Sequence, residues 1–301
     1  MRIFLEIART GQILGAAKRL GLNHATVARQ LSALEEDLKT KLVNRATTGS
    51  SLTPAGVALL GAAERAESEF LKVGAELAAS SDRLQGTVRV GAPDGLGNYF
   101  LAARLASFAA ENPGLKIQFE PLPRVFSLAK READIVITLE RPEEGKLVCT
   151  KLTDYSLSFY ASASYLERSS AITDTSDLSA HLLITYIDDI VYSPALDYAS
   201  SLAGVAVHRF ECGSVMGQVE AVRAGAGVGI LHDYAASHFP ELKRILPDQI
   251  FTRSYWLLSH ADTHDTPRVR AVHRYVASIV RQSRNELLVR HPGSEQSAQS
   301  E

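Results

Sequence analysis

The sequence predicts a two-part protein: an all-α helix-turn-helix unit at the N-terminus, then a long helix and a larger α/β region. Three observations support this prediction. Apolar residues recur at helical spacing through the first eighty residues, strands and helices alternate from residue 85 onward, and 301 residues are too many for one ordinary core.

Composition and charge distribution narrow the class of protein. Hydrophobic residues make up 46% and charged residues 22%, which is typical of a soluble globular chain. The net charge is −2, yet residues 1–60 hold eight basic and four acidic side chains, so the remainder is acidic. This asymmetry suggests a polyanion-binding segment joined to one that avoids nucleic acid. With no signal peptide or membrane-length apolar run, we expect a soluble, cytoplasmic protein.

Three short helices are predicted at the N-terminus. The first ends at Gly11, the second covers Ile13–Leu20, and Gly21 permits a tight turn. Asn23 is an N-cap candidate for the third helix, His24–Lys39. The outer face of that helix is polar and carries His24, Thr26, Arg29, Gln30 and Ser32. These features indicate a helix-turn-helix; a helical hairpin whose outer face is merely solvated is the alternative.

A two-stranded wing is predicted next. Lys41–Arg45 has the pattern of a strand, Thr47–Ser50 of a turn, and Ser51–Thr53 of a second short strand. A basic residue at the base of such a wing is suited to a phosphate or a neighbouring groove. The wing therefore disfavours the hairpin alternative and predicts a winged helix-turn-helix over residues 1–53.

A long helix is predicted from Pro54 to about Ser80, because proline is tolerated in a first helical turn. It forms a linker over residues 54–85. Its apolar stripe includes Val57, Leu60, Phe70, Val73 and Leu77. A small domain cannot cover this stripe, so we expect the same helix of a second subunit to pack on it. The alternative is a helix packed only on its own chain.

Strands and helices alternate from residue 85 onward. Strands are predicted at Thr87–Gly91, Lys116–Glu120, Ala133–Leu139, Leu157–Ala161, His181–Tyr186, Val207–Phe210 and Val228–Leu231. Helices are predicted at Asn98–Glu111, in a segment ending near Arg131, and at Val215–Ala224 with Gly225 as its C-cap. This alternation predicts an α/β unit with a parallel sheet, where ligands gather at the carboxyl ends of strands.

Several blocks together resemble the LysR-type transcriptional regulator family. In the N-terminal part they are Ala16–Leu20, Ala28–Leu38, Leu42–Arg45 and Leu52–Gly56, all in the family's order and spacing. In the α/β region they are Gly114–Ile117, Ala133–Ile137 and Ala224–Ile230. The resemblance implies a sequence-specific DNA-binding regulator. It also implies a small-molecule effector bound between two α/β lobes with the fold of periplasmic solute-binding proteins.

The resemblance also implies domain boundaries. The effector-binding domain is expected over residues 86–290, with lobe I at 86–150 and 262–290 and lobe II at 155–257. Two crossovers are expected near Thr150–Asp154 and Leu257–Ala261. The polar residues 291–301 are expected to form a disordered tail.

The DNA contacts follow from the helix, the wing and the resemblance. Arg29 and Gln30, with His24 and Thr26 after the capping Asn23, are expected to read base edges. Lys41, Arg45 and Thr48 are expected to contact the DNA backbone or minor groove. Where the family usually has Ser-Gln-Pro-Ala-Leu-Ser-Arg-Gln, this chain has His24 for a glutamine and Ala28 for a serine, so we expect an unusual operator preference. The family also has several residues before the first helix, so we expect the natural start to lie upstream of Met1; a shortened first helix is the alternative.

The effector site implied by the resemblance lies between the lobes. Lobe I contributes Asp94, Gly95, Leu96, Gly97 and Asn98 after the first strand, and Leu139, Glu140 and Arg141 after the third. Lobe II contributes Gly213, Ser214, Val215 and Met216, where backbone N–H groups at a helix start are expected to hold a carboxylate. Arg141 is expected to add charge-assisted pairing; the alternative is that Arg141 is solvated and Asp94 is only a helix-start residue. Asp94, in contrast, argues against an anion close by.

Other sites are disfavoured by the sequence. Gly225–Gly229 follows a helix and precedes a strand, the reverse of a dinucleotide loop. The segment from His260 to Asp265 has metal-capable side chains but is expected to be an exposed loop, and Cys149 and Cys212 have no metal-binding or disulfide spacing. We therefore expect no cofactor, no metal and no enzyme activity. The expected partners are double-stranded DNA, an unidentified effector and RNA polymerase. The chain is also expected to form a homodimer or homotetramer and to bind no membrane. A cytoplasmic solute-binding protein and an enzyme on the same lobes are the alternatives.

Overall fold

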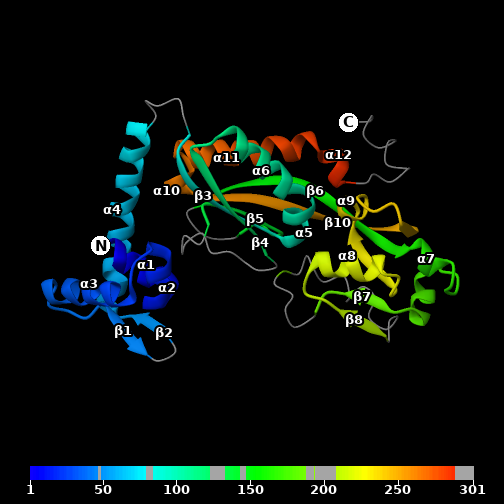
Figure 1. The fold of residues 1–301 in the computed structure, drawn as a ribbon, viewed down its shortest axis with the longest axis horizontal. Coiled ribbons are helices and arrows are strands. Elements are labelled where there is room, and N and C mark those ends of the chain that lie inside the picture. Colours follow the sequence, from blue (N-terminus) through cyan, green and yellow to red (C-terminus); the bar gives the residue numbers. More distant parts are fainter. Residues whose placement is uncertain are drawn as a thin grey trace.

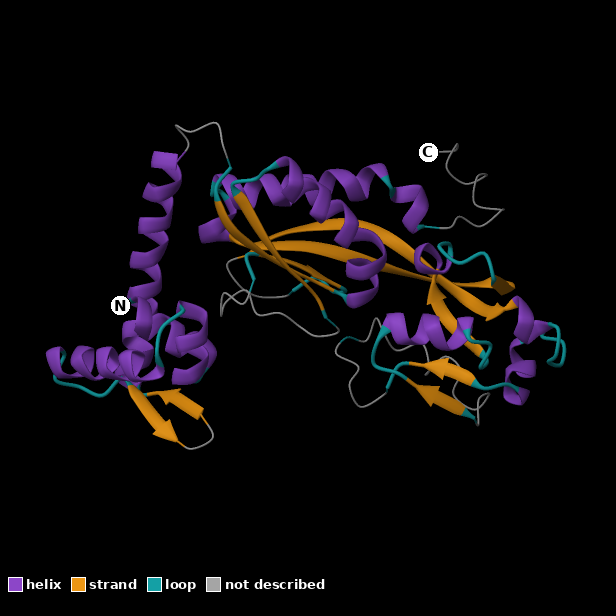
Figure 2. Cartoon of the chain, viewed as in Figure 1, coloured by secondary structure: helices purple, strands orange, loops and turns teal. Residues whose placement is uncertain are grey.

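The computed structural model describes residues 1–46, 49–78, 84–122, 133–142, 147–187, 193 and 208–288. These residues form a small helical domain with a wing, one long helix and an elongated α/β domain (Figures 1 and 2). Among them, no helix is both long enough and apolar enough to cross a membrane.

Three helices surround the N-terminal core: α1 (Arg2–Thr10), α2 (Ile13–Leu20) and α3 (His24–Asp37). The helices α1 and α2 end at Gly11 and Gly21, with φ of 64° and 65°, a left-handed conformation that glycine adopts at least cost. The predicted helices are confirmed, although α3 ends at Asp37 instead of Lys39.

The wing consists of β1 (Val43–Ala46) and β2 (Gly49–Leu52), which pair antiparallel with Val43 opposite Leu52. The predicted hairpin is therefore present, with strand boundaries shifted by one or two residues. The long helix α4 (Pro54–Ala78) starts at Pro54 as predicted. It leaves the wing and extends away from the helical domain (Figure 1).

The α/β domain contains the remaining elements. Its first part holds β3 (Gly86–Ala92), α5 (Asp94–Leu96), the π-helix η1 (Gly97–Leu101), α6 (Ala102–Glu111), β4 (Leu115–Pro121) and β5 (Ile135–Thr138). Its middle part holds β6 (Leu147–Ser162), α7 (Ala163–Leu166), η2 (Thr175–Ala180), β7 (Leu183–Thr185), β8 (Arg209–Glu211), α8 (Val215–Arg223), β9 (Val228–His232) and α9 (Asp233–Ala236). The last part holds β10 (Leu242–His260), α10 (Ala261–His264), α11 (Pro267–Gln282) and α12 (Arg284–Leu287).

Within the described part of the α/β domain, eight strands form one sheet in the order β4-β3-β5-β10-β6-β9-β7-β8. The outer strands are parallel at both ends: β4, β3 and β5 in lobe I, and β9, β7 and β8 in lobe II. The long strands β6 and β10 run antiparallel and connect the lobes. The predicted parallel arrangement thus holds within each lobe, and the helices α6 and α11 lie along one face of lobe I (Figure 2).

The second crossover lies earlier than expected. Residues Trp256–Ser259 of β10 pair with β5, which belongs to lobe I, and the register between β6 and β10 shifts between Tyr255 and Trp256. The chain has therefore re-entered lobe I before the expected crossover at Leu257–Ala261. Hydrophobic periodicity cannot locate this point because β10 is one continuous strand on both sides of it.

Two further segments differ from the prediction. The helix expected at Asn98–Glu111 starts at Asp94 and contains the π-helical turn η1. The expected loop from His260 to Asp265 contains the short helix α10, capped by the His260 ring, which accepts a hydrogen bond from the Asp262 N–H. The helix expected to end near Arg131 lies outside the described residues.

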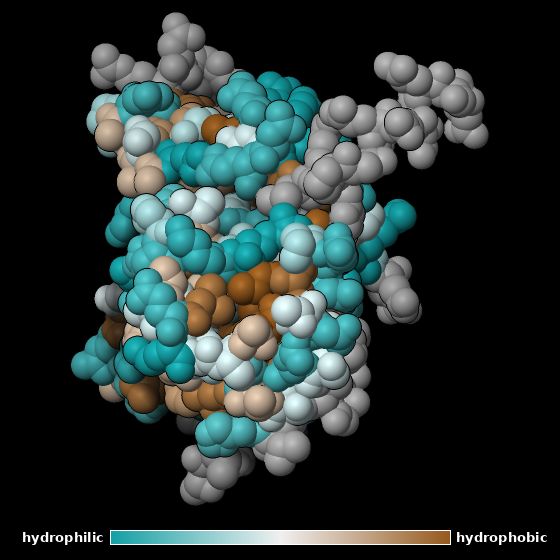
Figure 3. All heavy atoms as spheres, turned by 90° about the vertical axis from the view of Figure 1, so that its right-hand side faces the viewer, coloured by the Kyte–Doolittle hydropathy of each residue, from teal (hydrophilic) through white to brown (hydrophobic). Residues whose placement is uncertain are grey.

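Separate cores stabilise the two parts. In the α/β domain, one continuous apolar cluster runs from Val88 in β3 to Leu287 in α12 through both lobes. In the N-terminal domain, the core packs around Phe4, Val27 and Leu31. The end of lobe II is mostly hydrophilic, with apolar surface limited to small areas (Figure 3).

Candidate functional site

The third helix presents an exposed polar face opposite a buried one. Val27 and Leu31 are completely buried, which fixes the orientation of α3 on the domain. The Asn23 side chain accepts a hydrogen bond from the Ala25 N–H (2.8 Å), so the predicted N-cap is confirmed. Arg29 lies opposite the buried stripe and is exposed, and His24 is exposed at the start of the helix. This arrangement leaves the outer face of α3 free for a polyanion.

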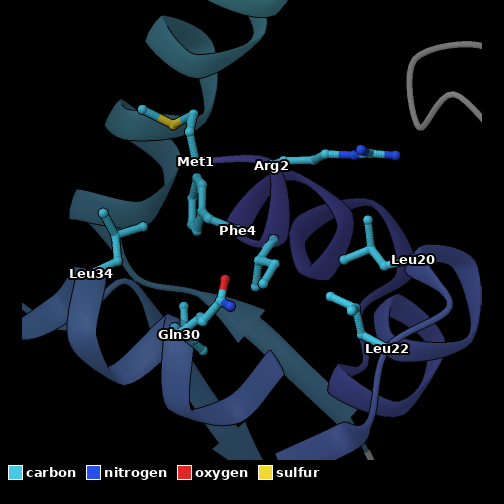
Figure 4. A pocket seen from close by; sticks show the side chains of 9 residues that line it. Met1, Arg2, Phe4, Leu20, Leu22, Gln30 and Leu34 are labelled. Atoms are coloured by element: carbon cyan, nitrogen blue, oxygen red, sulfur yellow. The ribbon is translucent and has the colours of Figure 1, made fainter. Parts of the chain in front are cut away.

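Gln30 is exposed like Arg29 and His24, but it lies at a pocket on the flank of the helix. It lines a pocket of about 400 Å³ between α1 and α3, together with apolar side chains that include Phe4, Leu22 and Leu34. Figure 4 shows Gln30 among these side chains. Gln30 therefore lies toward α1 on the flank of α3, while Arg29 lies on the outer face. Thr26 is half-buried on the same helix.

A buried carboxylate fixes the start of the wing. Glu35 is 3% exposed, and its Oε1 accepts hydrogen bonds from the N–H groups of Leu42 (2.9 Å) and Val43 (3.2 Å). Lys41 Nζ donates to Glu35 Oε2 (2.7 Å). Burial disfavours ionisation of Glu35, but these hydrogen bonds outweigh it and lower its pKa. Lys41, predicted as a phosphate contact, is thus paired with Glu35, although most of its side chain is exposed.

The other predicted wing residues are only partly described. Arg45 lies in β1 opposite Ser50, and nothing further is described of its side chain. Thr48 lies outside the described residues. Neither prediction is tested by the geometry.

Charged groups connect the helical domain to α4. Arg9, 7% exposed, donates to Glu67 of α4 and to Glu6 (3.1 Å). Arg19 lies 3.5 Å from the same Glu6 carboxylate. A buried ion-pair group of this kind holds α4 in one direction relative to α1.

The predicted apolar stripe on α4 is divided. Phe70 and Val73 are 79% and 51% exposed, whereas Leu60 packs partly against the core of the helical domain. Val57 is also exposed, but it lies roughly 140° around the helix axis from Phe70. The side chain of Leu77 is not among the described ones. Only Phe70 and Val73 therefore remain as described candidates for one subunit-pairing face.

The helix start in lobe II is occupied by a carboxylate of lobe I. Asp94 Oδ2 accepts a hydrogen bond from the Val215 N–H (2.7 Å) and another from Ser214 Oγ (3.1 Å). Asp94 is 3% exposed, and this burial raises its pKa despite the hydrogen bonds that favour its ionised form. The prediction that these N–H groups are open to a ligand carboxylate is therefore wrong for this conformation.

The other lobe I residues of the predicted effector site are mostly buried. Leu96 belongs to the core, Gly95 contacts lobe II, and Asn98 is half-buried. A Cβ at Gly97 would lie 2.4 Å from Pro121 Cβ, so glycine is required by a close approach of chain segments.

The remaining residues predicted for the effector site differ in how far they are exposed. Leu139 is buried, Gly213 is half-buried and Met216 is 43% exposed. Arg141 is exposed, with its guanidinium 5.9 Å from the centre of the Trp256 ring. The structure thus brings Asp94, Ser214 and Val215 together but does not bring Arg141 to the α8 start by any described contact.

An aromatic group at the junction of the lobes was missed by the sequence analysis. The rings of Tyr155 in β6 and Tyr255 in β10 stack at 4.0 Å, and His232 stacks on Tyr155 at 5.3 Å. The hydroxyls of Tyr234 and Tyr255 lie 2.9 Å apart. Burial lowers the pKa of His232 to about 3, so this ring is neutral at physiological pH. Isolated aromatic residues in separate strands carry no sequence signal of this stacking.

Metal and redox chemistry gain no support from the described residues. No group of three or more His, Cys, Asp or Glu side chains suited to a metal occurs among them. Cys149 and Cys212 are both free, and burial raises the pKa of the Cys149 thiol, which makes it less reactive.

A helix-turn-helix with an exposed polar helix, a long connecting helix and a two-lobed α/β domain define a DNA-binding regulator with a ligand-sensing domain. Residues 1–57 match the bacterial regulatory helix-turn-helix protein family of lysR type, and residues 81–280 match the LysR substrate binding domain. The chain belongs to the LysR family of transcriptional regulators. It is a DNA-binding transcriptional regulator with an effector-binding domain, in a family of regulators and not of enzymes.

Characterised relatives agree with this assignment. The chain is 26% identical to the HTH-type transcriptional activator AaeR of Escherichia coli K12 over 76% of this chain and 74% of AaeR. It is 24% identical to the HTH-type transcriptional regulator CrgA of Neisseria meningitidis over 62% of this chain and 63% of CrgA.

Solved structures share the fold. The structure of CrgA matches 92% of this chain and 97% of its own, with a TM-score of 0.57 and 21% identity. Full-length LysG of Corynebacterium glutamicum, solved with Arg bound as its effector, matches 93% of this chain and 96% of its own, with a TM-score of 0.60 and 18% identity.

Proposed function

We propose that α3 enters the major groove of an operator and that Arg29 is its principal base-reading side chain. The observation that carries this proposal is the position of Arg29, exposed on the face opposite the buried Val27 and Leu31. An arginine at this place can donate two hydrogen bonds to guanine. His24 and Thr26 extend the surface toward the helix start, and Asn23 caps it. Arg45, Thr48 and Lys41 are proposed as contacts to the DNA backbone or minor groove.

The regulator acts as a homodimer or homotetramer in this proposal. Phe70 and Val73 give α4 an exposed apolar surface beyond the helical domain, and a second α4 is a simple partner for it. A two-fold pair of α3 helices then reads two half-sites of an operator.

The effector, of unknown identity, binds between the two lobes, with the residues from Trp256 onward counted in lobe I. The loop from Asp94 to Asn98 and the start of α8 support this location because Asp94 accepts hydrogen bonds from Ser214 and Val215 across the lobes. Effector binding alters the lobe arrangement, the oligomer and contact with DNA or RNA polymerase in the cytoplasm.

The test is fluorescence anisotropy of the full chain on the DNA upstream of its own gene, across a salt series. Preference over random DNA that weakens with salt supports the proposal. Arg29→Ala is expected to lose about 1–3 kcal/mol of operator affinity, which is about fivefold to 150-fold. Arg270→Ala, which removes an exposed arginine from α11, is the matched control and should retain the affinity. Equal affinity of wild type for operator and random DNA would refute the proposal.

A further inference from the structure

A direct contact between the lobes is formed by Asp94, Ser214 and Val215. Asp94 lies in lobe I, where a single proline separates it from the end of β3. Val215 is the first residue of α8 in lobe II, and Ser214 precedes it. Two hydrogen bonds join them, from the Val215 N–H (2.7 Å) and from Ser214 Oγ (3.1 Å) to the same Asp94 oxygen. The partners are about 120 residues apart in the chain, so only closure of the lobes brings them together.

This contact also replaces the ordinary cap of α8. Helix starts have backbone N–H groups without partners inside the helix, and a serine at the N-cap usually accepts from one of them. Ser214 is the N-cap of α8 but makes no side-chain cap hydrogen bond; its hydroxyl donates to Asp94 instead. The capping acceptor therefore comes from the opposite lobe.

The lobes leave little space beside this contact. A Cβ at Gly95 would lie 3.1 Å from Val215 Cγ1 and 3.4 Å from His232 Cε1, both in lobe II. Asp94 and Val215 are 3% and 4% exposed. A ligand group at the α8 start would occupy the position of the Asp94 carboxylate.

A second carboxylate of lobe I makes a similar bond. Glu140, shortly after β5, accepts a hydrogen bond from Ser193 Oγ (2.7 Å), and Ser193 lies between β7 and β8 in the chain. Carboxylates that follow two neighbouring strands of lobe I thus accept from hydroxyls of lobe II.

We infer that Asp94 holds the two lobes closed in the absence of an effector by acting as the cap of α8 from the opposite lobe. The inference rests on the proposed function in so far as the cleft is the effector site. An effector that binds there has to release Asp94 from Val215 and Ser214. Asp94 thereby sets how strongly the effector-free lobes resist opening.

The experiment compares Asp94→Ala with Asp134→Ala in the full chain, without DNA and without added ligand. Asp134 is a matched control because its carboxylate also accepts a backbone N–H, that of Arg89 (2.8 Å), but both residues belong to lobe I. Hydrogen exchange at residues 213–218 reports on the N–H groups of the α8 start. A spin-label distance between Ser107→Cys on α6 and Ala224→Cys after α8 reports on the lobe separation. Both native cysteines are replaced by alanine, and labelled chains are diluted into unlabelled ones.

Asp94→Ala is expected to exchange about tenfold or more faster at Val215 and Met216 and to give a longer or broader distance distribution. Asp134→Ala should change neither. A wild-type distance distribution in Asp94→Ala, or unchanged exchange at 213–218, would overturn the inference.

Two further measurements distinguish loss of the Asp94 contact from unfolding of lobe II. Exchange in β9 reports on unfolding of lobe II; if Asp94→Ala loses protection there, Asp94→Asn is judged by the same two readouts. Asp94→Asn keeps one acceptor oxygen and is expected to lie between wild type and Asp94→Ala. Neither readout needs DNA, so the lobe contact is tested independently of operator binding. If the wild type does not prefer its operator, the proposed function is rejected, but these readouts still show whether Asp94 holds the lobes together.

Discussion

Two buried carboxylates, Glu35 in the helical domain and Asp94 in the effector domain, both fix a neighbouring segment, but their partners lie at very different distances along the sequence. Each is 3% exposed and accepts hydrogen bonds from backbone N–H groups. Glu35 accepts from residues seven and eight positions later, and Asp94 from one 121 positions later. Glu35 also has a cation beside it, Lys41, and its pKa is lowered, whereas burial raises the pKa of Asp94.

The difference indicates how fixed each contact is. A lowered pKa means that the folded state favours the ionised Glu35, so its bonds stabilise the wing throughout the range above its ordinary pKa of 4.5 and are lost in acid below it. A raised pKa means that keeping Asp94 ionised costs free energy in the folded state. Protonation in acid removes this cost. A stable contact suits a DNA-reading unit, and a costly one suits lobes that must open.

The largest effect is expected for Glu35→Ala. The change leaves the buried N–H groups of Leu42 and Val43 without their acceptor, so we expect a loss of about 3 kcal/mol in the stability of the helical domain. Urea unfolding and operator anisotropy measure it. Glu36→Ala removes the exposed neighbouring carboxylate and should change stability by less than about 0.5 kcal/mol. Equal effects of the two variants would break the comparison.

Subunit pairing is expected to respond next. Phe70 is 79% exposed, and burying a phenylalanine between two α4 helices contributes about 1.5–3 kcal/mol. Phe70→Glu should therefore weaken self-association by at least about tenfold in sedimentation velocity. Ala58→Glu places the same charge at an exposed position roughly 120° away on α4 and should leave the association constant unchanged.

Acid should lower the stability of the α/β domain because His232 is protonated more readily in the unfolded state. Its pKa is about 3 in the folded chain and 6.5 ordinarily, so the unfolded state binds the proton first and stability falls as the pH drops below 6.5. At pH 5 the expected loss is about 2 kcal/mol relative to neutral pH. His232→Phe keeps an aromatic ring against Tyr155 and should show a shallower pH dependence in urea unfolding. His273, whose pKa is lowered to about 4, keeps part of the slope in both proteins. Parallel pH profiles would contradict this prediction.

The smallest effect is expected for Gln30→Ala. Because Gln30 lines the pocket toward α1, its truncation should cost less than about 0.5 kcal/mol of operator affinity. A loss equal to that of Arg29→Ala in anisotropy would place Gln30 among the base-reading residues.

Most local structure could be predicted from the sequence. Gly11 and Gly21 end α1 and α2, Asn23 caps α3, and Pro54 starts α4, because each of these residues acts on the backbone within a few positions. The family blocks also identify the two domains correctly. The sequence assigns outward roles to Lys41 and Leu60. Lys41 instead pairs with Glu35, and Leu60 packs partly against the core, and neither partner is visible in a local pattern.

The sequence by itself determined the helices, the wing, the α/β alternation and the family, since these follow from short-range periodicity and from motifs at fixed spacing. Only the tertiary structure decided what Asp94 does. Its partners Ser214 and Val215 lie about 120 residues away, and no local pattern encodes a bond that forms only when the two lobes meet. The stack of Tyr155, Tyr255 and His232 arises in the same way, because three separate strands carry it. Contacts of this kind form only when segments distant in the sequence pack together in the folded domain, so short-range patterns do not predict them.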